Sequence, residues 1–98
     1  MRRAVAVHRL AENELNEAAQ YYDLESPGLG IAFLKEFERC IESILKHPGS
    51  GPLVAEEIRR RLLPGFPYGI LYKVMPKETR VLAVMNLKRR PMYWVGRG

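Results

Sequence analysis

The spacing of apolar positions predicts the elements of the chain. Residues 3–8 alternate small and branched apolar side chains, as a short strand does, with Val5 and Val7 on one face. Over residues 11–25 the apolar positions step by four, three and four, which predicts an amphipathic helix. The stripe of that helix comprises Ala11, Leu15, Ala18 and Tyr22.

A second helix is predicted over residues 30–46. Ser26-Pro27-Gly28 separates it from the first helix, and Pro48-Gly49 follows its end. Because only a few residues connect the two helices, we expect an antiparallel hairpin. The face expected to be buried consists of Leu34, Phe37, Ile41, Ile44 and Leu45, with Phe33 and Cys40 beside it.

The rest of the chain has the pattern of three strands. They are expected at residues 58–63, 68–75 and 80–87, separated by proline-bearing turns. The order predicts an α+β fold: an N-terminal strand, an antiparallel helical hairpin and a three-stranded antiparallel meander. The helices would pack on one sheet face, which leaves the other face free to carry polar residues.

Length and composition limit the class of protein. A chain of 98 residues fits a single domain, residues 1–98. With 47% hydrophobic and 28% charged residues, it is not a disordered chain. No apolar run is long enough to cross a bilayer, and the basic N-terminus precedes no long apolar stretch, so neither a membrane span nor a signal peptide is expected. We therefore expect the protein in the cytoplasm.

Positive charge is concentrated in the second half of the chain. Residues 1–50 hold 6 Lys/Arg and 8 Asp/Glu, whereas residues 51–98 hold 10 Lys/Arg and 3 Asp/Glu. The two halves therefore carry net charges of −2 and +7, which sum to the overall +5. This asymmetry favours a negatively charged partner, either nucleic acid or an acidic protein segment, over a basic face that only aids solubility.

Most common catalytic chemistries lack a signature here. His8 and His47 are far apart, and Cys40, the one cysteine, falls on an apolar helix face, so neither a metal site nor a disulfide framework is expected. No phosphate-binding glycine motif and no Ser/His or Cys/His nucleophile motif is present. We expect no metal and no cofactor.

Basic and aromatic residues of the second half are the remaining candidates. Arg59 and Arg61 share one face of their strand by alternation, and Lys73 projects from the next strand. Such a mixture suits nucleic acid, since rings stack on bases and guanidinium groups hold phosphates. The alternative is that the aromatic residues are core residues and the charges are solvated. The aromatic residues in question are Tyr68, Tyr72 and Trp94.

Several segments in this order resemble the RelE/ParE superfamily of bacterial toxins. They are Arg59-Arg60-Arg61-Leu62, residues 66–72 and residues 81–91, followed by Tyr93-Trp94 and Arg97. The helical half agrees, because Ser26-Pro27-Gly28, Phe33-Leu34 and Lys46-His47-Pro48-Gly49 are similar to the hairpin of ParE-like members. The resemblance covers essentially the whole chain.

The resemblance implies the toxin of a type II toxin–antitoxin pair, of the kind called plasmid stabilisation proteins. Its partner would be a small ParD- or RelB-like antitoxin, whose tail covers the basic face of the toxin. A toxin–antitoxin hetero-oligomer is expected by the same analogy.

Two targets are implied, one for each branch of the superfamily. RelE-like members cut mRNA on the ribosome, and their catalytic residues would correspond here to Arg59, Arg61, Lys73, Arg89 or Arg90, and Tyr93. ParE-like members inhibit DNA gyrase and perform no chemistry of their own. The long helical hairpin favours the ParE-like branch.

Two departures from the RelE-like pattern also favour an inhibitor. Asn86 stands where many members have a histidine, and an amide cannot exchange protons. The basic strand carries arginine, which stays protonated, where RelE-like enzymes tend to use lysine. A third hypothesis is a basic binding module without toxicity. The residues expected to bind a target, nucleic acid or antitoxin are Arg59, Arg61, Lys88, Arg89, Arg90, Trp94 and Arg97.

Overall fold

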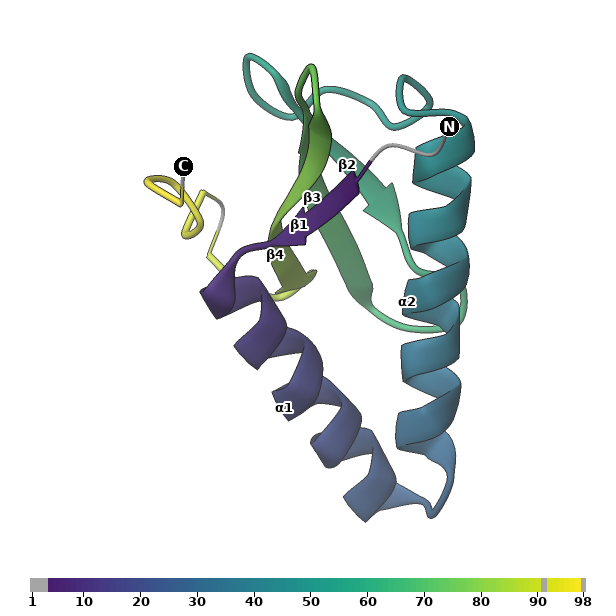
Figure 1. Ribbon diagram of the computed structural model, residues 1–98. Helices are drawn as coiled ribbons and strands as arrows, with labels where there is room; N and C mark the ends of the chain where they lie inside the picture. Colours follow the sequence, from purple (N-terminus) through teal and green to yellow (C-terminus); the bar gives the residue numbers. More distant parts are fainter. Residues whose placement is uncertain (1–3, 91, 98) are drawn as a thin grey trace.

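The computed structural model describes residues 4–90 and 92–97. In chain order its elements are β1 (Ala4–Val7), α1 (Arg9–Glu25), α2 (Leu29–Lys46), β2 (Ile58–Leu62), β3 (Tyr68–Val74) and β4 (Glu78–Asn86). The two helices form a hairpin that extends well beyond the sheet (Figure 1). The predicted α+β fold and its element order are confirmed, with element ends shifted by one or two residues.

The four strands form one mixed sheet in the order β1-β4-β3-β2. The pairs β2–β3 and β3–β4 are antiparallel, as the meander predicts. Strand β1 pairs with β4 in parallel, with Val7 opposite Val81, so the sheet is not wholly antiparallel. Four residues are too few for the pattern of β1 to specify which strand it pairs with. The pairing depends on where the chain lies after it leaves the helical hairpin.

The buried face of α2 includes the predicted Phe37 and Ile44 but is shifted from the predicted face. Phe33, Phe37, Cys40 and Ile44 are buried together with Gly30, whereas the predicted Leu34, Ile41 and Leu45 are only half-buried beside them. Relative to the predicted stripe, the buried stripe is thus rotated about the helix axis by about one residue, because α2 faces both α1 and the sheet. In α1 the predicted stripe is correct: Ala11 and Ala18 are buried, and Leu15 and Tyr22 pack against the same core.

The two helices lie close together at Gly30. A β-carbon built there would lie 2.4 Å from the carbonyl oxygen of Ala19, which is helix backbone and cannot move aside alone. We expect Gly30→Ala to lower the free energy of unfolding by about 1–3 kcal/mol through overpacking. Gly49→Ala is the control, since a β-carbon there meets nothing within 4 Å. Urea denaturation of both variants measures the difference; equal stabilities would contradict this packing.

The sheet face opposite the helices carries an apolar cluster as well as polar residues, so it is less polar than the sequence analysis allows. Leu71, Ala83 and Trp94 are buried there in a second, smaller cluster. The C-terminal segment carries Trp94 back over the sheet. A register shift between Leu71 and Tyr72 leaves Leu82 as an extra residue in β4, and residues 81–84 are all buried.

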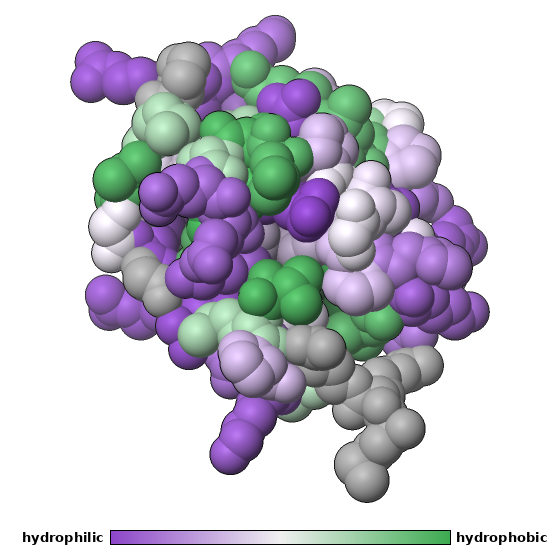
Figure 2. Space-filling model, turned by 90° about the horizontal axis from the view of Figure 1, so that it is seen from above, coloured by the Kyte–Doolittle hydropathy of each residue, from purple (hydrophilic) through white to green (hydrophobic). Residues whose placement is uncertain are grey.

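The outer surface mixes polar and apolar groups. Seen from above, hydrophilic side chains project around the rim, and hydrophobic residues form small groups between them (Figure 2). Apolar residues are exposed near the start of the chain, where Val5, Val7 and Leu10 keep 37–39% of their surface. Neither described helix is long and apolar enough to cross a membrane.

Candidate functional site

Arg59 and Arg61 of β2 point towards the helices and form hydrogen bonds to the loop after α2. Arg59 lies opposite Tyr72 of β3 and Arg61 opposite Ile70, and both of these partners belong to the main core. Arg59 Nη1 donates to the carbonyl oxygens of Gly49 (3.2 Å) and Gly51 (2.8 Å). The two arginines therefore share a face, as alternation predicts, and that face is the helix side.

Arg61 and Tyr72 complete the anchoring of the loop that follows α2. Arg61 donates to the hydroxyl oxygens of Ser50 (2.8 Å) and Ser43 (2.9 Å). The Tyr72 hydroxyl donates to the carbonyl oxygen of Pro48 at 3.0 Å, and its ring is fully buried. Several N–H donors of Arg59 and Arg61 thus form hydrogen bonds within the protein.

Lys73 and Trp94 lie on the opposite face of the sheet. Lys73 faces Ile58 across the β2–β3 ladder, and its ammonium group pairs with Glu57 at 3.2 Å. Trp94 is 6% exposed and packs with Leu71 and Ala83, so its ring faces are not open for base stacking. The five residues that correspond to the RelE-like set therefore do not converge on one point.

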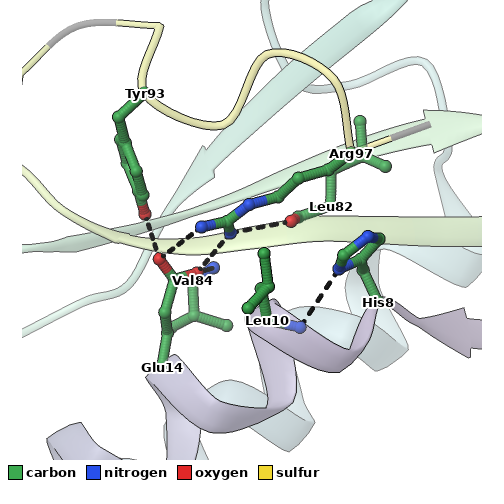
Figure 3. Close-up of polar contacts among 7 residues, drawn as sticks. All are labelled: His8, Leu10, Glu14, Leu82, Val84, Tyr93 and Arg97. Atoms are coloured by element: carbon green, nitrogen blue, oxygen red, sulfur yellow. Dashed lines mark hydrogen bonds and ion pairs between the residues drawn. The ribbon is translucent and has the colours of Figure 1, made fainter.

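Glu14 of α1 forms hydrogen bonds with side chains of the C-terminal segment (Figure 3). Its carboxylate accepts hydrogen bonds from the Tyr93 hydroxyl (2.6 Å), from both Arg97 Nη atoms (2.8 and 3.2 Å) and from the Val84 backbone N–H (3.1 Å). Arg97 also donates to the carbonyl oxygen of Leu82 at 3.2 Å. The Glu14 and Arg97 side chains are only 15% and 12% exposed. This network fixes the C-terminal segment to helix α1 and strand β4.

Tyr93 is held by the same network, and the pKa of its phenol is raised. Burial raises the pKa of its phenol above the ordinary value, and the hydrogen bond to Glu14 and the negative charge of Glu14 raise that pKa further, against the opposing effect of Arg97 and Arg89. The Arg89 guanidinium lies 4.1 Å from the centre of the ring, where a cation–π contact orients both groups.

The raised pKa of Tyr93 makes stability depend on alkaline pH. Above about pH 10 the unfolded chain loses this proton while the folded chain keeps it, so the free energy of unfolding falls as pH rises. We expect Tyr93→Phe to show a smaller decline between pH 9 and 11. Urea denaturation across this range measures it, with Tyr21→Phe, an exposed tyrosine of α1, as control. An equal decline in the wild-type protein and Tyr93→Phe would contradict the assignment.

An exposed basic turn follows β4. Lys88, Arg89 and Arg90 are all exposed. Asn86 shapes the turn, because its side-chain oxygen accepts from the Lys88 N–H at 2.9 Å and its carbonyl oxygen accepts from the Arg89 N–H at 2.9 Å. We call residues 88–90 the basic turn. A cleft of about 250 Å³ adjoins it, and its lining includes Glu17, Tyr21, Tyr68, Asn86, Arg89 and Tyr93.

The cleft and the basic turn combine exposed cations with the carboxylates of Glu14 and Glu17, so they can bind an anionic or mixed surface. Glu14 accepts hydrogen bonds from three residues, and neither His8 nor His47 lines the cleft. His8 instead caps α1, accepting from the Leu10 N–H at 3.1 Å (Figure 3), and His47 ends α2. Within residues 4–90 and 92–97, no three His, Cys, Asp or Glu side chains form a group that could hold a metal ion.

Sequence reasoning missed Glu14 as a site residue. An acid near the start of a helix is ordinarily solvated and interacts with the helix dipole, whereas the Glu14 side chain is mostly buried. A signal was present, because Glu14 lies three residues after Ala11 and four before Ala18, at the edge of the apolar stripe. Its partners are about 70 to 83 residues away, so no local pattern identifies them.

Comparison with solved structures shows that the fold occurs in a known protein. The chain is similar to one described as "Chromosomal ParDE TA system from P. aeruginosa", with a TM-score of 0.75 and 16% sequence identity. The match covers 86% of this chain and 95% of the other. At that identity the similarity establishes the fold alone.

The family follows from the sequence itself. Residues 5–92 match the model of the ParE toxin of the type II toxin–antitoxin system parDE. The protein belongs to the ParE toxin family. This is the branch of the RelE/ParE superfamily that the sequence analysis favours. None of the curated proteins gives a significant match.

Proposed function

We propose that this protein is the toxin of a type II toxin–antitoxin pair and that it inhibits DNA gyrase by binding to it. Members of the ParE branch act on gyrase without chemistry of their own. The exposed basic turn and the adjoining cleft form the contact surface in this proposal.

The positions and contacts of the candidate catalytic residues are the main support for this proposal. Arg59 and Arg61 hold the loop after α2, and Lys73 is ion-paired on the other face. Tyr93 is fixed to Glu14, with its pKa raised above the ordinary value mainly by burial. Cleavage of RNA at the 2′-hydroxyl needs a base, an acid and cations around one phosphate. This distribution supports a binding inhibitor over a nuclease.

We also propose that a small antitoxin neutralises the toxin by covering its basic turn. The second half of the chain carries a net charge of +7, to which an acidic segment is complementary. Neutralisation is tested by co-expression with each small open reading frame that adjoins the gene. Growth is expected to recover, and a complex should co-purify.

A short pulse of expression in a bacterium, followed by mapping of mRNA 5′ ends, distinguishes the two targets. We expect growth arrest with intact messages. New ends within translated codons, lost in an Arg61→Ala variant, would identify a ribosome-dependent nuclease instead. Absence of arrest would favour a basic binding module without toxicity.

A further inference from the structure

Arg89 has a defined contact on the protein surface that the other cations of the basic turn lack. Its guanidinium carbon lies 4.1 Å from the centre of the Tyr93 ring. Among the described residues, the side chains of Lys88 and Arg90 have no partner for a hydrogen bond, an ion pair or a ring contact. All three cations are exposed, so burial does not distinguish them.

The Tyr93 ring that supports Arg89 is itself fixed. Its hydroxyl donates to Glu14 at 2.6 Å, and Arg97 donates to the same carboxylate at 2.8 Å. The Arg97 guanidinium carbon also lies 5.0 Å from the centre of the Tyr93 ring. Because the Glu14 and Arg97 side chains are mostly buried, the ring has a fixed position in the wall of the cleft. Helix α1 thus determines, through Glu14 and Tyr93, where the Arg89 guanidinium group lies.

The backbone of Arg89 is fixed separately from its side chain. Its N–H donates to the carbonyl oxygen of Asn86 at 2.9 Å. The contact with Tyr93 involves the flat face of the guanidinium group and leaves the N–H donors at its edge. None of these side-chain donors is bonded to a described residue, so they remain available to a partner.

A side chain that is ordered before binding loses less freedom when a complex forms. Long cationic side chains carry much rotamer entropy, and ordering them at an interface opposes binding. Lys88 and Arg90 would be ordered only in the complex, whereas Arg89 already lies against Tyr93. Arginine and tyrosine are also enriched among the few residues that dominate binding energies. Arg89 is therefore the cation of the basic turn best prepared for a specific contact.

We propose that Arg89 is the anchor by which the basic turn binds its protein target, and that Tyr93 is a positioning residue that acts through Arg89. This assignment rests on the proposed function, in which the basic turn and the cleft contact gyrase. Lys88 and Arg90 contribute long-range attraction, which weakens with ionic strength. Tyr93 then serves in binding and transfers no proton.

A double-mutant cycle between Arg89 and Tyr93 tests the anchor by inhibition of purified gyrase. We expect half-inhibition to need about ten-fold more Arg89→Gln protein and about five-fold more Tyr93→Leu protein than wild type. The variant with both changes should resemble Arg89→Gln alone, because Tyr93 acts through Arg89. Tyr93→Phe keeps the ring and should stay within about two-fold of wild type, as should Lys88→Gln and Arg90→Gln. Lys35→Gln, which changes an exposed cation of α2, should inhibit as wild type does.

Two further measurements separate the anchor from a structural role and from the identity of the target. By NMR, side-chain protons of Arg89 should show ring-current shifts in wild type and Tyr93→Phe but not in Tyr93→Leu, with folding checked by urea denaturation. The same cycle is repeated for growth arrest under graded induction. If wild-type toxin spared gyrase while growth arrest showed the coupling, gyrase would be excluded as the target and the anchor supported.

The anchor would be overturned by additive losses in the cycle, since Tyr93 would then act independently of Arg89. Unshifted Arg89 protons in wild type would also overturn it. Arg89→Gln and Lys88→Gln change exposed side chains, so their comparison holds even if Tyr93→Leu is unstable. Equal losses in these two variants, or no effect of Arg89→Gln in either assay, would likewise contradict the anchor.

Discussion

Replacing Glu14 by alanine is expected to lower the free energy of unfolding by about 3 kcal/mol. The substitution leaves the Arg97 guanidinium group, the Tyr93 hydroxyl and the Val84 N–H without their acceptor. Because the Glu14 and Arg97 side chains are only 15% and 12% exposed, water replaces those contacts poorly. Stabilities of small domains are about 5–15 kcal/mol, so this loss is a large fraction of the total.

Urea denaturation measures the loss, and hydrogen exchange of the Val84 amide shows whether it is local to the network. The matched control is Glu17→Ala, which removes an exposed acid one turn along α1. We expect the control to change stability by less than about 0.5 kcal/mol. If Glu14→Ala and Glu17→Ala unfolded at the same urea concentration, the network would not hold the C-terminal segment.

Neutralising the basic turn is expected to weaken toxicity strongly while leaving the fold intact. The triple variant Lys88→Gln, Arg89→Gln, Arg90→Gln removes three exposed charges that take part in no described ion pair. Loss of steering and of several surface contacts should raise the expression level needed for growth arrest by about ten-fold or more. The measurement is growth after graded induction, with protein amounts compared by immunoblot.

The control for this variant carries the same change in net charge on α2. Lys35→Gln, Arg39→Gln, Lys46→Gln removes three exposed cations from the helix. We expect this protein to arrest growth at the wild-type level of expression. Equal loss of toxicity in both variants would show that net charge matters and that the basic turn is not the contact surface.

The fold was largely predictable because its signals are local. Each signal lies within one element or turn. These signals are the helical periods, the strand patterns, and the breaks at Ser26-Pro27-Gly28 and Pro48-Gly49. The parallel pairing of β1 with β4 was not predictable, since Val7 and Val81 are joined only by the tertiary path of the chain. The covered second face had a local signal, because a strand with four consecutive apolar residues is typical of burial on both sides.

The site was less predictable than the fold. Alternation places Arg59 and Arg61 on one face and Arg60 on the other, but three consecutive arginines do not show which face meets the core. Pairing with Tyr72 and Leu71 decides it. Likewise, Glu14 resembles any acid in the first turns of a helix until the C-terminal segment brings Tyr93 and Arg97 onto it.

Inhibition of gyrase by the purified toxin is the most direct test of the central claim. Relaxed plasmid, gyrase and ATP are incubated with increasing amounts of the protein, and supercoiling is followed on agarose gels. We expect supercoiling to fail as toxin approaches the concentration of gyrase, and to be spared by the triple variant of the basic turn. Undiminished supercoiling at a large excess of folded wild-type toxin would contradict the account.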